Sequence, residues 1–264
     1  MHRLEKTIRT QNAAHKTALI PFCTAGYPDP ATFWPTLLEL DENGADIIEI
    51  GVPFSDPVAD GPVIEEASRI ALQNGVNLRD LLAQLTQNRS LFHADIVLMG
   101  YYNPFLQYGL EALGKDLERA GVAGVIVPDL PIDEATPLRS ALAPHDIVQI
   151  PLVGPNTSKE RMERYAKDAA GYVYVVSVMG VTGARKQLPP DIINTLLLAK
   201  ATFSIPLALG FGLIEPSQIA MFPEAARPDV ASSRQYPRPW CKILCGQMAL
   251  RPALCASKST HLPG

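Results

Sequence analysis

The chain has 264 residues, of which 47% are hydrophobic and 19% charged, and its formal net charge is −4. This composition excludes a disordered or fibrous chain, and the mildly acidic charge argues against a nucleic-acid-binding protein. No apolar run approaches the ~20 residues that span a bilayer, and residues 1–15 lack the apolar core of a signal peptide. We therefore expect a cytoplasmic protein with no membrane contact.

Short runs rich in β-branched residues predict seven strands. They lie at residues 18–24, 45–51, 95–101, 124–129, 147–152, 172–177 and 205–211. Several runs are apolar on both faces, such as Ile96-Val97-Leu98-Met99. Strands of this kind are typical of a parallel sheet that helices cover on both sides.

Amphipathic stretches between these runs predict helices. They lie at residues 31–42, 77–85, 106–119, 133–142, 158–169 and 189–200. Capping residues such as Asp29 and Ser158 mark several of the starts. Strand and helix alternate seven times, which predicts an α/β fold of the (β/α)₈ TIM-barrel type with one further unit. The alternative is a doubly wound open sheet, but the first strand leads into Cys23-Thr24-Ala25-Gly26-Tyr27 instead of a G-x-G-x-x-G turn.

The second predicted strand carries a glutamate, Glu49, between isoleucines. Burial would raise the pKa of this carboxyl group, so that it could give and take a proton near neutral pH. The alternative is an edge strand with Glu49 in water. The loop that follows, residues 52–62, holds three prolines and two aspartates, Asp56 and Asp60. Prolines stiffen a loop, although Asp56 could also be an ordinary turn residue.

Glycine-rich loops follow the sixth and seventh predicted strands, around Gly183 and Gly212. Such loops expose backbone N–H groups to an anion, and barrels often bind phosphate near their last strands. The alternative is that these glycines serve only as flexible turns.

Five motifs in this chain closely resemble, in order and spacing, those of the tryptophan synthase alpha subunit family. They are EIGVPFSDPVADGP (49–62), LMGYYNP (98–104), VPDLP (127–131), GVTG (180–183) and GFG (210–212). The resemblance covers about residues 1–230. It implies a (β/α)₈ barrel and a lyase of tryptophan biosynthesis, which cleaves indole-3-glycerol phosphate to indole and glyceraldehyde 3-phosphate.

The resemblance also implies roles for individual residues. Glu49 matches the general acid/base and Asp60 the second catalytic carboxylate. The substrate-binding positions are Phe22, Tyr101, Leu152, Tyr174, Thr182, Gly183, Phe211 and Gly212. The partner-facing positions are Pro53, Asp56, Pro57 and Asn103. The partner implied is a pyridoxal-phosphate-dependent beta subunit in an α₂β₂ heterotetramer, with no cofactor and no metal in this chain.

Other enzymatic functions would require residues that this sequence does not show in the expected places. A Schiff-base aldolase needs a desolvated lysine on a strand, and the predicted strands contain none. A metal-dependent aldolase needs clustered ligands, whereas the five histidines are scattered. A non-enzymatic function remains as an alternative, in which the barrel activates a beta subunit without cleaving substrate.

The last part of the chain departs from the family pattern. Residues 231–264 contain five Lys or Arg and no acidic residue, and the family's Gly-Ser pair after the eighth strand is missing. We therefore expect a barrel domain over 1–230 with an atypical or missing eighth βα unit, followed by a tail over 231–264 that is disordered or translated out of frame. A zinc site formed by Cys241, Cys245, Cys255 and His261 is the functional alternative for this tail.

Overall fold

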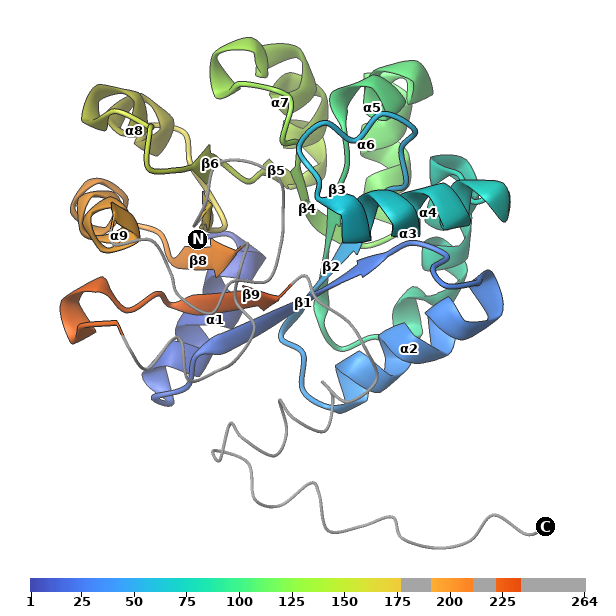
Figure 1. Cartoon of the computed structure of the whole chain (residues 1–264), viewed down its shortest axis with the longest axis horizontal. Coiled ribbons are helices and arrows are strands. Elements are labelled where there is room, and N and C mark those ends of the chain that lie inside the picture. Colours follow the sequence, from blue (N-terminus) through green and yellow to red (C-terminus); the bar gives the residue numbers. More distant parts are fainter. Residues whose placement is uncertain (177–190, 211–221, 234–264) are drawn as a thin grey trace, which may run out of the picture.

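The computed structural model describes residues 1–176, 191–210 and 222–233, and its strands form one parallel sheet surrounded by helices (Figure 1). The strands are β1 (Ala18–Thr24), β2 (Ile47–Gly51), β3 (Asp95–Met99), β4 (Val122–Ile126), β5 (Val148–Gln149), β6 (Leu152–Val153), β7 (Val173–Val176), β8 (Leu207–Gly210) and β9 (Val230–Ser233). Their order in the sheet is β5-β4-β3-β2-β1-β9-β8-β7-β6.

The sheet closes through the short segment that joins β5 to β6. The Ile150 N–H donates to the Val125 carbonyl at 2.8 Å on one side, and the Tyr174 N–H donates to the Pro151 carbonyl at 2.9 Å on the other. β5 and β6 therefore act as one strand that pairs with both β4 and β7. The result is a closed barrel of eight strands, which confirms the (β/α)₈ prediction and excludes the open doubly wound sheet.

The eighth strand of this barrel is β9, which lies in a segment with no strand pattern in its sequence. Its residues pair with β1, where Ile20 lies opposite Ser232, and with β8, where Ala208 lies opposite Val230. Of the two expectations for the eighth unit, atypical or missing, a missing strand is therefore wrong, because the backbone completes the ladder whatever the side chains. β9 also crosses the boundary predicted at residue 230. The rest of the tail lies outside the described residues.

Helices cover the outer face of the barrel (Figure 1). They are α1 (Arg3–Ala13), α2 (Pro30–Glu42), α3 (Pro62–Gln73), α4 (Leu78–Asn88), α5 (Tyr102–Tyr108), α6 (Leu110–Arg119), α7 (Thr136–Leu142), α8 (Lys159–Ala166) and α9 (Asp191–Thr202). None of the helices in the described ranges has the length and apolar character needed to cross a membrane.

Local sequence explains most of the helix boundaries. Asp29 caps α2 by accepting the Thr32 N–H at 2.8 Å, and Ser158 caps α8, as predicted. The helix expected over 106–119 is instead two helices, because the chain turns at Gly109 with φ +89°. The helices α1 and α3 were not predicted.

Side-chain alternation along β2 divides the protein into an inner and an outer core. Ile48 and Ile50 pack against the surrounding helices, whereas Ile47 belongs to the cluster inside the barrel. Because successive strand residues point to opposite faces, Glu49 shares the inner face with Ile47. The unpredicted helix α1 adds Leu4 and Ile8 to the same inner cluster.

The buried carboxylate of Asp41 at the end of α2 anchors the chain that enters β3. It accepts the Ala94 N–H at 2.6 Å and the His93 N–H at 3.0 Å. Burial alone would raise the pKa of Asp41, but these hydrogen bonds, together with one from the His93 side chain, outweigh burial and hold the pKa below its ordinary value. The carboxylate therefore stabilises the fold above an unfolded-state pKa of about 3.9, and this contribution is lost as the pH falls through the lower folded-state pKa.

We expect the Asp41→Asn variant to lose about 2 kcal/mol of unfolding free energy at pH 7, because the amide removes charged hydrogen bonds from buried N–H groups. Urea unfolding of both proteins at pH 7 and below pH 3 measures this. The difference between them should shrink at the lower pH as Asp41 becomes protonated. A difference that is the same at both values would contradict the role given to the ionised carboxylate.

Candidate active site

Glu49 lies in the middle of β2 with 0% of its surface exposed. It stands opposite Phe22 of β1 and Val97 of β3 in the parallel ladders. This position excludes the alternative in which Glu49 faces water from an edge strand. The Ser232 hydroxyl, which reaches Glu49 from β9, donates to its Oε2 atom at 3.4 Å. A carboxyl group with this degree of burial is placed for proton transfer away from bulk water.

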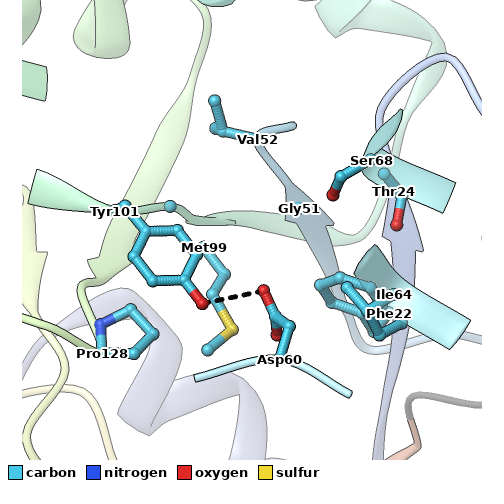
Figure 2. Close-up of a pocket in the computed structure, with 11 residues that line it drawn as sticks. Phe22, Thr24, Gly51, Val52, Asp60, Ile64, Ser68, Met99, Tyr101 and Pro128 are labelled. Atoms are coloured by element: carbon cyan, nitrogen blue, oxygen red, sulfur yellow. Dashed lines mark hydrogen bonds between the residues drawn. The ribbon is translucent and has the colours of Figure 1, made fainter. Parts of the chain in front are cut away.

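Asp60 lies in the loop after β2, and its carboxylate is held beside Tyr101 (Figure 2). The Tyr101 hydroxyl donates to Asp60 Oδ2 at 3.0 Å and accepts the Ala59 N–H at 2.9 Å. The Tyr101 ring is buried and stacks on Phe54, with 5.2 Å between ring centroids. One tyrosine therefore fixes both the backbone of this loop and the orientation of the Asp60 carboxylate.

A pocket opens beside Asp60 at the carboxyl ends of β1, β2 and β3 (Figure 2). It is lined by Phe22, Thr24, Gly51, Val52, Asp60, Ile64, Ser68, Met99, Gly100, Tyr101 and Pro128. Mainly apolar and aromatic walls, with the hydroxyl groups of Thr24 and Ser68 and a single carboxylate, suit a flat aromatic ring that carries an N–H group. The pocket brings together the predicted residues Phe22, Asp60 and Tyr101.

The far side of the barrel interior contributes two further predicted residues. Leu152 of β6 lies opposite Tyr174 of β7 in the ladder. The Tyr174 side chain is buried, and its hydroxyl lies 3.4 Å from the Ser232 Oγ atom. Tyr174, Ser232 and Glu49 therefore form a continuous polar path across the barrel interior.

Comparison with known proteins shows to which family this chain belongs. The sequence profile of the family described as tryptophan synthase alpha chain matches residues 8–234. The chain belongs to this family. The resemblance inferred from the five motifs is thereby confirmed, and with it the role of a lyase that cleaves indole-3-glycerol phosphate in tryptophan biosynthesis.

Individual relatives agree with the family profile. The tryptophan synthase alpha chain of Desulfovibrio desulfuricans is 64% identical over 231 residues, which cover 88% of this chain and 91% of the relative. That of Nitratidesulfovibrio vulgaris is 56% identical over 217 residues, covering 82% and 84%. In a solved structure of Mycobacterium tuberculosis tryptophan synthase, one chain matches with a TM-score of 0.80 and 38% identity, covering 88% of each chain.

Other positions predicted from the alpha-chain motifs fall in two groups. Thr182, Gly183, Phe211 and Gly212 lie outside the described residues, as do the four candidate zinc ligands of the tail. Asp56 and Asn103 are exposed, Pro57 is half-buried, and Pro53 is buried. Within the described ranges, no three His, Cys, Asp or Glu side chains cluster as metal ligands would.

Several site residues were missed by the sequence reasoning. Ile64 and Ser68 reach the pocket from α3, a helix that was not predicted. The Pro62 that follows Gly61 is a helix-start signal that could have revealed this helix. Ser232 was missed because a polar strand in an otherwise apolar barrel gives no periodic signal.

Gly210 ends β8 directly against Tyr174. A Cβ atom at position 210 would overlap the phenol ring of Tyr174. We expect Gly210→Ala to cost about 1–3 kcal/mol of stability, as overpacking does, and to lower the rate of indole-3-glycerol phosphate cleavage. Thermal unfolding and indole release measure the two effects. In the double variant Gly210→Ala/Tyr174→Leu, the shorter side chain at position 174 makes room for the new Cβ atom and should restore part of the stability. A double variant no more stable than Gly210→Ala would contradict the clash.

Proposed function

We propose that cleavage of indole-3-glycerol phosphate takes place in the barrel interior between Glu49 and Asp60. The observation that carries this proposal is the contrast between the two carboxyl groups. Glu49 is wholly buried on the inner face of the barrel, whereas Asp60 is partly exposed and accepts a hydrogen bond from Tyr101. Removal from water favours the neutral form of Glu49, and the polar setting of Asp60 favours its ionised form.

These two protonation states fit a retro-aldol cleavage. A neutral Glu49 protonates C3 of the indole, and the positive charge that develops on the ring is relieved at N1–H. The Asp60 carboxylate accepts that proton. Glu49, now a carboxylate, takes the proton of the side-chain hydroxyl while the bond between C3 and the glycerol chain breaks. Asp60 returns its proton to N1 as the ring regains aromaticity. Indole and glyceraldehyde 3-phosphate result, with Glu49 again protonated and Asp60 again ionised.

The remaining predicted residues would hold the substrate in this position. In our proposal the indole ring lies against Phe22, Tyr101, Leu152 and Tyr174. Backbone N–H groups near Thr182, Gly183, Phe211 and Gly212 would bind the phosphate, as glycine-rich loops do. Neither a cofactor nor a metal in this chain is needed for these steps.

Product analysis tests the proposed reaction. The purified chain is incubated with indole-3-glycerol phosphate, and indole and glyceraldehyde 3-phosphate are both quantified. We expect the two products in equal amounts. Borohydride added with substrate should trap no adduct, since no lysine lies on a described strand. A trapped lysine adduct, or one product without the other, would contradict the mechanism.

Family membership also implies a beta-subunit partner, which we propose binds at the loop after β2 and at α5. Exposed side chains gather in these two segments. Val58 is 86% exposed next to Asp56 and Pro57, and Leu106 of α5 is 49% exposed near Asn103. Apolar side chains exposed beside a polar rim are typical of a protein interface. We further propose an α₂β₂ assembly in the cytoplasm, with pyridoxal phosphate in the beta subunit.

A further inference from the structure

The polar path inside the barrel contains one residue to which the proposed mechanism gives no role. Ser232 of β9 is completely buried, and its hydroxyl lies between two other completely buried groups. It donates to Glu49 Oε2 at 3.4 Å, and it lies 3.4 Å from the Tyr174 hydroxyl. A buried hydroxyl with two polar neighbours restricts their arrangement, because each hydrogen bond lost in the barrel interior costs free energy.

The barrel architecture explains why these three side chains meet. In a (β/α)₈ barrel, each interior layer takes its side chains from alternate strands. Glu49, Tyr174 and Ser232 come from β2, β7 and β9, which are the second, sixth and eighth strands of this barrel. The three residues therefore face one another across the interior, although they are far apart in the sequence.

The geometry points to Ser232 as a positioning residue that orients the Glu49 carboxyl group for proton transfer. This inference rests on the proposed role of Glu49. The acceptor oxygen of a neutral carboxyl group is its carbonyl oxygen, so a hydrogen bond accepted at Oε2 keeps the acidic proton on Oε1. Rotation of the carboxyl group about its last torsion is restricted at the same time. Because Ser232 has a single proton and donates it to Glu49, the Tyr174 hydroxyl is the donor in its contact with Ser232.

The distances of 3.4 Å are longer than the usual range of about 2.5–3.0 Å for hydroxyl hydrogen bonds. Catalytic hydrogen bonds are often long without substrate and tighten in the reacting complex. Ser232 should therefore act mainly on the rate of the chemical step, with little effect on substrate binding. Loss of one neutral hydrogen bond corresponds to about a three- to tenfold decrease in rate.

Infrared spectroscopy tests the contact without depending on turnover. The carboxyl band of Glu49 is isolated as the difference between the wild-type spectrum and that of Glu49→Gln. We expect Ser232→Ala to shift this band, Ser232→Thr to leave it close to the wild-type position, and Ser68→Ala, which removes another buried serine hydroxyl, to leave it unmoved. A band unchanged by Ser232→Ala would overturn the inference, even if the chain cleaves indole-3-glycerol phosphate.

Steady-state kinetics of the same variants tests the consequence. Ser232→Ala should lower kcat about three- to tenfold and change KM less than about twofold, since the hydroxyl acts through Glu49. Ser232→Thr should recover most of kcat, which a purely structural defect at β9 would not predict. Unchanged kcat in Ser232→Ala beside an active wild type would refute the positioning role alone. A silent wild type would refute the proposed function, while the infrared shift would still decide whether Ser232 orients Glu49.

Discussion

Glu49→Gln should reduce cleavage of indole-3-glycerol phosphate at least ~100-fold, the scale of a general acid–base contribution. The amide has nearly the same shape as the carboxyl group, and it can still accept a hydrogen bond from Ser232. It cannot, however, deliver a proton to the indole ring or accept one from the side-chain hydroxyl. Initial rates of indole release at saturating substrate measure this effect.

The controls for Glu49→Gln separate chemistry from folding. The variant should unfold at a temperature close to that of the wild type, because an amide is easier to bury than a charge. It should also bind substrate, since the walls of the pocket come from other residues. Turnover near the wild-type rate in a folded Glu49→Gln would remove Glu49 from the mechanism.

Asp60→Asn should also reduce cleavage at least ~100-fold. The asparagine side chain can accept the hydrogen bond that Tyr101 donates to Asp60 at 3.0 Å, so the loop should keep its conformation. What the amide cannot do is take the N1 proton as positive charge develops on the indole. Rates with Asp60→Asn therefore report on the charge of residue 60 rather than on its position.

Tyr101→Phe is the matched control for Asp60→Asn. It keeps the ring that stacks on Phe54 and leaves Asp60 ionised, but it removes the hydroxyl that orients the carboxylate. We expect a smaller decrease, about tenfold, because the variant loses the hydrogen bonds with Asp60 and with the Ala59 N–H but keeps the charge of residue 60. A larger loss in Tyr101→Phe than in Asp60→Asn would mean that loop geometry, and not the Asp60 charge, limits the reaction.

The sequence predicted the barrel because its signals are local and repeated. Runs apolar on both faces, such as the one around Val97, specify buried parallel strands whatever their neighbours. The burial of Glu49 could be predicted for the same reason, since isoleucines flank it on a strand of this kind. The family motifs then added Asp60 and Tyr101, which spacing alone could not have connected with Glu49.

What could not be predicted depends on contacts between distant segments. Ser232 forms part of β9 because β1 and β8 provide hydrogen-bonding edges on both sides, and no local propensity reports such edges. Ile64 and Ser68 reach the pocket only because α3 packs over its rim. The prediction that residues 231–264 are out of frame remains a prediction; resequencing the gene together with an intact mass of the protein tests it.

The rate of indole release from indole-3-glycerol phosphate tests the central claim most directly. It should be measured with the purified chain alone and with a tryptophan synthase beta subunit. We predict release by the chain alone and a higher rate with the beta subunit. No indole under either condition, from a folded chain that still activates the reaction of the beta subunit, would contradict the claim that Glu49 and Asp60 form a working catalytic site.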